Sequence, residues 1–132
     1  MFEKPFTVQP VYEWWPTPEC YRHYPSGQGL PQKLKVWRVQ QMTSQPAADA
    51  RPYGAVAQPW KQEDAPDAEA LAIGFNTGKM NGALAVGRHG NFLQWGFSAP
   101  PSRMTEAGRK FFLNCVCYIV KFDGKAPDSR RK

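Results

Sequence analysis

Residues 82–97, GALAVGRHGNFLQWGF, predict a β-hairpin. Two short apolar runs, 83–86 and 92–95, flank a polar stretch that contains two glycines. This pattern is typical of two antiparallel strands joined by a tight turn, because glycine adopts the backbone angles that a chain reversal needs. We therefore expect a five-residue loop at 87–91 between the two strands.

Residues 105–124, TEAGRKFFLNCVCYIVKFDG, predict one long helix over about 105–122. Thr105 is a favourable N-cap, and Gly124 is a favourable stop. Glycine inside a helix costs about 1 kcal/mol relative to alanine, so Gly108 indicates close packing at that point. Apolar residues at spacings of three and four predict the buried stripe. Its members are Gly108, Phe112, Cys115, Ile119 and Phe122, widened by Phe111 and Tyr118.

Three further runs, at 34–40, 53–58 and 70–75, have the composition of strands. With the hairpin they predict a mixed, largely antiparallel sheet of four or five strands that carries the C-terminal helix on one face. The fold class expected is therefore α+β. The single helix can cover only one face of such a sheet, so the second face needs another element to pack against it.

Residues 1–33 are rich in proline and aromatic residues. Proline at this density argues against long helices and interior strands, while the aromatic side chains still need burial. We expect an extended arm that wraps over the core, with one helical turn at 17–23 capped by Thr17. Residues 1–124 are then a single domain, and residues 125–132 are a basic, mobile tail.

The composition sets limits on the class of protein. The chain has 132 residues and is 42% hydrophobic, which argues against wholesale disorder. No apolar run approaches the roughly 20 residues that span a bilayer, and no secretory signal is recognised at the start. Three cysteines make no disulfide framework. We expect a cytoplasmic protein without a membrane partner, exported only if the chain belongs to a longer precursor.

Motifs for phosphate and calcium are incomplete. Residues 74–80, GFNTGKM, have three residues between the glycines and no Ser or Thr after the lysine, so they do not make a phosphate-binding loop. Asp64, Asp67 and Glu69 lack the glycine and the spacing of a calcium loop. A turn and a solvated loop are the better interpretations, and we expect neither cofactor nor metal.

The cysteines do not indicate catalysis either. Cys115 and Cys117 are two apart on a helix and therefore point to nearly opposite faces. Cys20 and His23 lie in the proline-rich arm, and no nucleophile elbow is present. No complete catalytic set is found, so the sequence favours a protein that is not an enzyme.

The hairpin carries the densest polar cluster of the chain. Arg88, His89 and Asn91 stand between glycines, and Trp95 follows across the hairpin. Glycines allow a turn to present several groups at one point, which favours a binding site for a small polar or carbohydrate ligand. The other interpretation is an ordinary turn whose polar side chains lie in water.

The charge is uneven along the chain. The net charge is +6, and residues 67–132 hold ten Lys or Arg against five Asp or Glu. With five tryptophans, this surplus also suits a nucleic-acid-binding protein that uses its basic C-terminal half. Apart from the tail, however, the basic residues do not form a stripe, so we favour the small ligand.

Several stretches together resemble a known family. They are EDAPDAE (63–69), GFNTGK (74–79), ALAVGRHGNF (83–92), WGF (95–97) and MTE (104–106), with Asn114 and residues 118–119. Over residues 6–127 the chain resembles the C-terminal portion of the trehalose-utilisation (ThuA)-like proteins of the class I glutamine amidotransferase-like superfamily.

The resemblance implies part of an α/β sandwich, a link to sugars, and a match between His89 and the family's histidine at a strand end. The cysteine that partners this histidine has no counterpart in the chain, whether it is truncated or free-standing. A partial sandwich exposes an apolar surface and a strand edge, and we expect a homodimer to bury both.

Overall fold

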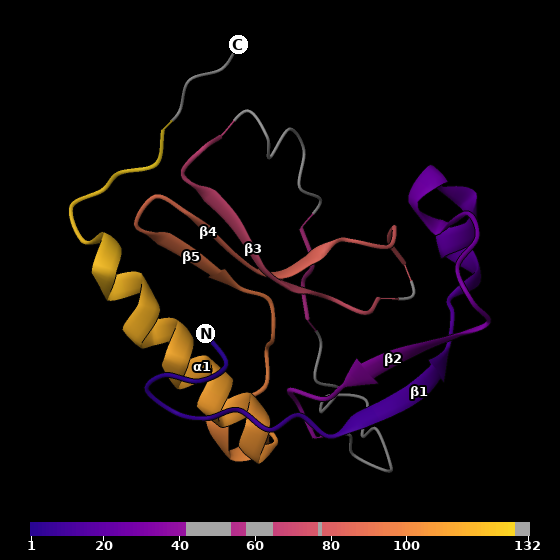
Figure 1. The fold of residues 1–132 in the computed structure, drawn as a ribbon, viewed down its shortest axis with the longest axis horizontal. Coiled ribbons are helices and arrows are strands. Elements are labelled where there is room, and N and C mark those ends of the chain that lie inside the picture. Colours follow the sequence, from indigo (N-terminus) through magenta and orange to yellow (C-terminus); the bar gives the residue numbers. More distant parts are fainter. Residues whose placement is uncertain (42–53, 58–64, 77, 129–132) are drawn as a thin grey trace.

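The computed structural model describes residues 1–41, 54–57, 65–76 and 78–128 (Figure 1). In these residues the chain forms two antiparallel sheets, of two and three strands, and one α-helix. The fold class is α+β, as the sequence predicts. The strands do not join into one sheet of four or five, because the first long strand pairs with a strand from the N-terminal arm.

The two-stranded sheet consists of β1 (Tyr12–Pro16) and β2 (Lys33–Trp37). The arm is therefore partly a strand and not only an extended cover. The sheet has only two strands, which suits the proline that ends β1. A 3-10 helix, Glu19–His23, follows at the predicted place, but Thr17 does not cap it. Instead the Thr17 hydroxyl donates a hydrogen bond to the carbonyl oxygen of Pro31.

The three-stranded sheet has the order β3–β4–β5, with bounds Ala68–Ile73, Leu84–His89 and Phe92–Trp95. The predicted hairpin is confirmed, but its turn is shorter than expected. Strand β4 continues through His89, so the turn is Gly90 and Asn91, and Gly90 has a φ of 56°. The expected five-residue loop is wrong.

The strand predicted at 53–58 is described only at residues 54–57. There, Gly54 and Ala57 form isolated bridges to Phe97 and Leu84. These four described residues thus lie along the three-stranded sheet without forming a regular strand of it. Residues 53 and 58 lie outside the described part of the chain.

Helix α1 (Glu106–Ile119) runs beside β5 and continues as a 3-10 turn, Val120–Phe122 (Figure 1). The predicted N-cap is confirmed, since the Thr105 hydroxyl accepts a hydrogen bond from the Gly108 amide at 3.0 Å. The close packing expected at Gly108 is also present. A Cβ atom there would lie 2.2 Å from the carbonyl oxygen of Val39.

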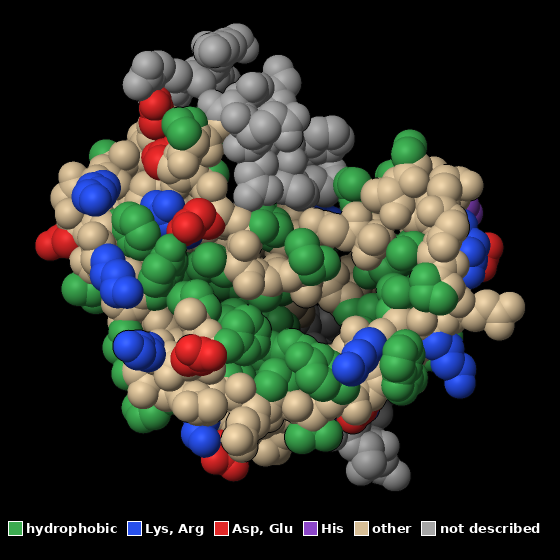
Figure 2. All heavy atoms as spheres, viewed as in Figure 1, with side chains coloured by type: hydrophobic (Ala, Val, Ile, Leu, Met, Phe, Trp, Pro, Cys, Tyr) green, Lys and Arg blue, Asp and Glu red, His purple; other side chains and the backbone are tan. Residues whose placement is uncertain are grey.

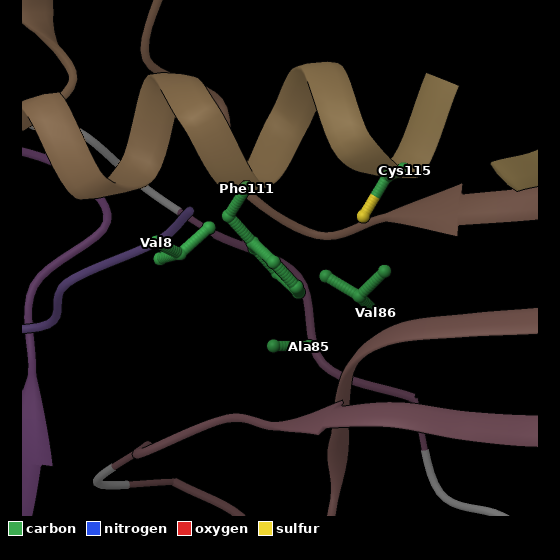
Figure 3. Packing of buried hydrophobic residues seen from close by; sticks show 5 residues of the cluster. All are labelled: Val8, Ala85, Val86, Phe111 and Cys115. Carbon is green, nitrogen blue, oxygen red and sulfur yellow. The ribbon is translucent and has the colours of Figure 1, made fainter. Parts of the chain in front are cut away.

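The core lies between α1 and the three-stranded sheet. Figure 3 shows Phe111 and Cys115 directed from α1 toward Val86 and Ala85, with Val8 of the arm beside Phe111. Phe111 is fully buried, whereas the neighbouring Phe112 is only half-buried. The buried face of the helix is therefore centred on Phe111 and Cys115. The sequence placed Phe112 on this stripe and Phe111 at its margin.

Asn114 is a buried polar residue on the same helix face. Its side-chain nitrogen donates to the carbonyl oxygens of Met1 and Phe6, at 2.6 and 2.7 Å. Its side-chain oxygen accepts from the Phe6 amide at 2.9 Å. A buried amide is stable when its groups are paired in this way. Asn114 thus fastens the start of the arm to the helix.

Replacing Gly108 by alanine should lower the free energy of unfolding, although helix propensity alone favours alanine by about 1 kcal/mol. The added methyl group would collide with the backbone at Val39, and such overpacking typically costs about 1–3 kcal/mol. Urea denaturation measures the change. A more stable variant would mean that α1 does not touch this backbone.

Candidate functional site

The four residues predicted for the hairpin site do not converge. Arg88 and His89 are neighbours on β4 and therefore point to opposite faces of the sheet. Asn91 is exposed at the turn, while Trp95 lies in β5, on the face that α1 covers. The exposure that the sequence predicts for Arg88 is wrong, since the residue is 8% exposed.

Arg88 links β3, β4 and the end of α1. Its Nε lies 2.5 Å from Glu69 Oε2, and its Nη1 donates to the carbonyl oxygen of Gly90 at 2.7 Å. The guanidinium carbon lies 3.7 Å from the ring centre of Phe122. Tyr118 donates its hydroxyl to the same Glu69 carboxylate at 2.7 Å. This pattern is that of a structural anchor.

The pKa values agree with this interpretation. Burial alone would raise the pKa of Glu69, but the hydrogen bonds from Arg88 and Tyr118 outweigh it and hold the pKa below the usual value. The pKa of Tyr118 is raised, first by burial and then by its hydrogen bond to Glu69. Glu69 is thus ionised when it accepts these bonds.

His89 lies beside Asp67, which in turn bonds to the region that leads to the C-terminus. Its Nε2 lies 3.2 Å from Asp67 Oδ1, close enough for an ion pair, but the angle is not that of a hydrogen bond. Asp67 Oδ2 accepts from the Asp128 amide at 2.8 Å, which is the main reason that the pKa of Asp67 is lowered. A Cβ atom on Gly90 would lie 2.5 Å from the Pro127 nitrogen.

Two residues of the predicted mobile tail make contacts in the structure: Pro127 lies beside Gly90 of the hairpin, and Asp128 bonds to Asp67. The contacts arise because Gly90 leaves room for the Pro127 backbone and Asp67 accepts from Asp128. The mobility of the tail stays a prediction. Residues 129–132 of the predicted tail lie outside the described part of the chain.

Trp95 belongs to the aromatic core. Its ring centre lies 5.0–5.7 Å from those of Phe97, Phe111 and Phe112. Its indole Nε1 is buried and has no hydrogen-bond partner among the described residues. Trp95 is half-buried and contributes to the packing of the core, and a role in ligand binding stays a prediction.

The cysteines of α1 point to opposite faces, as predicted. Cys115 is buried and Cys117 is exposed, and burial raises the pKa of the Cys115 thiol to about 12. Within the described ranges, no three His, Cys, Asp or Glu side chains are grouped so that they could hold a metal ion. Of the predicted acidic group, Asp64 lies outside those ranges. No described helix is long and apolar enough to cross a bilayer.

A cavity of about 550 Å³ lies between the two sheets. Figure 2 shows this hollow between the three-stranded sheet and the β1–β2 sheet. Aromatic residues line its walls, and its polar lining residues carry amide side chains or a positive charge. The aromatic residues are Trp15, Tyr21, Trp37, Phe75 and Phe97, and the polar ones are Lys35, Arg38, Gln40, Gln41, Asn76 and Asn81.

The contacts around Trp15 hold one wall of the cavity in place. Its ring meets that of Phe75 edge to face at 5.3 Å, and the Arg38 guanidinium carbon lies 4.8 Å from the ring centre. The indole Nε1 donates to Glu13 at 2.8 Å, and Arg38 Nε lies 3.0 Å from both Glu13 oxygens. The Glu13 pKa is lowered by Arg38 first and Trp15 second.

Tyr21, another lining residue, is fully buried, and its ring centre lies 6.1 Å from that of Phe75. Its hydroxyl accepts a hydrogen bond from the Asn76 amide at 3.0 Å. Arg38 bonds to Glu13 through its Nε atom alone, and its two terminal nitrogens donate a hydrogen bond to no described residue. The half-buried Asn81 side chain likewise bonds to no described residue. Polar groups with unused capacity therefore border a space with rigid aromatic walls.

A second hollow, of about 470 Å³, lies between residues 9–11 and the start of α1. Its charged side chains neutralise each other, since Glu13 pairs with Arg38 and Glu106 pairs with Lys110 at 2.9 Å. It offers few groups for a ligand, so the cavity between the sheets is the better candidate.

Sequence reasoning missed this cavity because its lining comes from segments far apart in the chain. The only signal in the sequence was the placement of two tryptophans, Trp15 and Trp37, each at an alternate position of a run with the composition of a strand.

Comparison of the chain with protein-family models, with curated proteins and with solved structures finds no match.

Proposed function

We propose that this protein is a non-catalytic binding module for a small polar ligand of the carbohydrate type, and that the ligand occupies the cavity between the sheets. The observation that carries the proposal is the cavity of about 550 Å³ with aromatic walls, bordered by Arg38 terminal nitrogens and an Asn81 side chain that bond to no described residue. Small-molecule sites typically measure about 300–1,000 Å³ and combine apolar walls with a few polar groups.

The lining favours a ligand with both apolar faces and hydrogen-bonding edges. A sugar ring presents C–H faces that pack on aromatic rings, and its hydroxyl groups both donate and accept. Trp15 and Phe75 offer ring surfaces, while Arg38 and Asn81 offer hydrogen-bonding groups at the border. The wall around Trp15 is already ordered by its contacts, so binding loses little conformational entropy.

This proposal moves the binding site away from the hairpin. Arg88 and Trp95 are engaged in the fold, and His89 faces Asp67. Asn91 is the exposed member of the predicted set. It therefore serves as a matched control for the side chains that border the cavity.

The test is a thermal-shift screen of neutral mono- and disaccharides, nucleotides and divalent metals, followed by calorimetry on the best saccharide. Trp15→Ala and Asn81→Ala should each weaken binding about tenfold or more, a loss of at least ~1.4 kcal/mol. Asn91→Ala should leave the affinity unchanged. Asn81→Ala keeps the test decisive if Trp15→Ala does not fold.

Two results would contradict the proposal. One is a saccharide affinity that falls in Asn91→Ala and not in Asn81→Ala, because the site would then lie at the hairpin. The other is a screen in which no saccharide raises the melting temperature. Binding that weakens steeply with salt would favour a charged ligand over a neutral sugar.

Nucleic-acid binding through the basic C-terminal half remains the alternative prediction. Two of its cations are already paired, Arg88 with Glu69 and Lys110 with Glu106. The ThuA-like relationship and the cytoplasmic location also stay predictions. So does the homodimer, which the exposed apolar residues Leu113 and Val116 of α1 and Val120 of the following turn would favour.

A further inference from the structure

We propose that the outer face of the β1–β2 sheet binds a short single-stranded nucleic acid. We call it the aromatic–lysine face and define it by Tyr12 and Trp14 of β1 and Lys33 and Lys35 of β2. Of these four residues Lys35 also borders the cavity, and the proposal does not depend on the ligand of the cavity.

The register of the sheet places these four residues on one side. Trp14 lies opposite Lys35, and Lys33 lies opposite Pro16, two residues further along β1. Residues directly opposite in an antiparallel pair share a face, and residues two apart on a strand do so as well. The alternate residues Glu13 and Trp15 belong to the other face, with Trp15 on the cavity.

The aromatic rings on this face are accessible. Trp14 is 64% exposed and Tyr12 is 52% exposed, whereas the tryptophans Trp37 and Trp95 pack against the core. The Lys35 ammonium lies 4.3 Å from the centre of the Tyr12 ring. An exposed indole beside basic side chains contributes little to the stability of the fold, because its apolar surface stays in contact with water.

The charge on this face is complementary to a polyanion. Neither Lys33 nor Lys35 forms an ion pair with a described residue. The nearest carboxylate on β1, Glu13, points to the other side and is taken by Arg38. Two unpaired cations therefore flank two accessible rings on a protein whose net charge is +6.

The combination selects single strands over duplexes. Bases stack on exposed aromatic rings whatever their sequence, and lysines contact the phosphates between them. Residues two apart on a strand are separated by about 6.8 Å, so Tyr12 and Trp14 can each receive one base of an extended segment. A duplex hides the faces of its bases, and the stacking contribution is then lost.

The experiment is fluorescence anisotropy of a labelled twelve-residue oligothymidylate at 50 and 200 mM salt, with the full chain. Trp14→Ala should weaken binding about tenfold or more. Lys33→Gln with Lys35→Gln should reduce the slope of log affinity against log salt by about 1.4. Phe92→Ala and Lys121→Gln, exposed residues on other elements, are matched controls and should bind like the wild type.

Circular dichroism melting checks that each variant is folded, and the exposure of Trp14 makes this expected. The proposal is overturned if Trp14→Ala binds as tightly as the wild type, or if a duplex of the same length binds as tightly as the single strand. It is also overturned if the wild type does not bind the oligomer, or if an uncharged polysaccharide binds through Trp14 without dependence on salt.

Discussion

Phe111→Ala is expected to lower the free energy of unfolding by about 3–5 kcal/mol, the largest effect of any substitution considered. Phe111 is fully buried and contacts the rings of Phe2, Trp37 and Trp95, with centre separations of 5.2–5.7 Å. Removing it opens a cavity where the arm, the helix and both sheets meet. Urea denaturation at neutral pH measures the change.

The matched control is Phe112→Ala, at the next position of the same helix. Phe112 is half-buried and packs on Trp95 alone among the described rings, so we expect roughly half the loss. An equal or larger loss at Phe112 would show that the buried face of α1 is centred where the sequence placed it. Such a result would contradict the core described here.

Arg88→Ala is expected to destabilise the protein by about 3 kcal/mol, the lower end of the range for breaking a buried ion pair, because the Glu69 side chain is 39% exposed. The substitution leaves Glu69 without its cation and removes the contact with Phe122. A side chain exposed on a turn, as the sequence predicts for Arg88, would change stability by about 0.5 kcal/mol at most. Thermal and urea denaturation distinguish the two cases.

The dependence of stability on pH gives a second measurement. The pKa of Glu69 is lower in the folded protein than its usual value of 4.5. Its contribution is therefore present above that value and is lost as the pH falls through the lowered folded-state pKa. In Arg88→Ala this acid-dependent loss should shrink, since burial is then opposed only by Tyr118. An unchanged acid profile would mean that Arg88 does not hold Glu69.

The elements that the sequence predicts well depend on local signals. Thr105 caps α1 through an amide only three residues away, and glycine at position 90 supplies the positive φ of the hairpin. The two strands of the hairpin and the helix follow from such patterns without any knowledge of distant contacts. Gly108 also predicted a close contact correctly. Glycine is unfavourable inside a helix, so its presence indicates that another segment of backbone packs against the helix at that point.

Other features were missed, either because their causes lie far along the chain or because a local pattern was not followed far enough. Arg88 is buried by Glu69 and Phe122, which are 19 and 34 residues away. Gly87 was assigned to the turn, although it lies within β4. Continuing the alternation from Val86 would have placed Arg88 on the buried face. Similarly, Asn114 lies three residues after Phe111, a spacing that puts it on the buried side of the helix.

The candidate site shows the same limit more strongly. The cavity forms where two sheets face each other, and no local pattern predicts which strands share a sheet. Trp15 and Phe75 are 60 positions apart in sequence, yet their rings touch. The division of the strands into two sheets is thus the feature that both escaped prediction and created the site.

The hydrogen bonds between the Asn114 side chain and the Phe6 backbone have a consequence for the folding of the chain during its synthesis. The two partners are separated by 108 positions. A ribosome adds about 5–20 residues each second, so the Phe6 segment exists for roughly 5–20 seconds before Asn114 is synthesised. During that interval Val8 and Phe2 lack the helix that covers them. The apolar side chains of the nascent arm stay uncovered until then, and the core closes only after translation has passed α1.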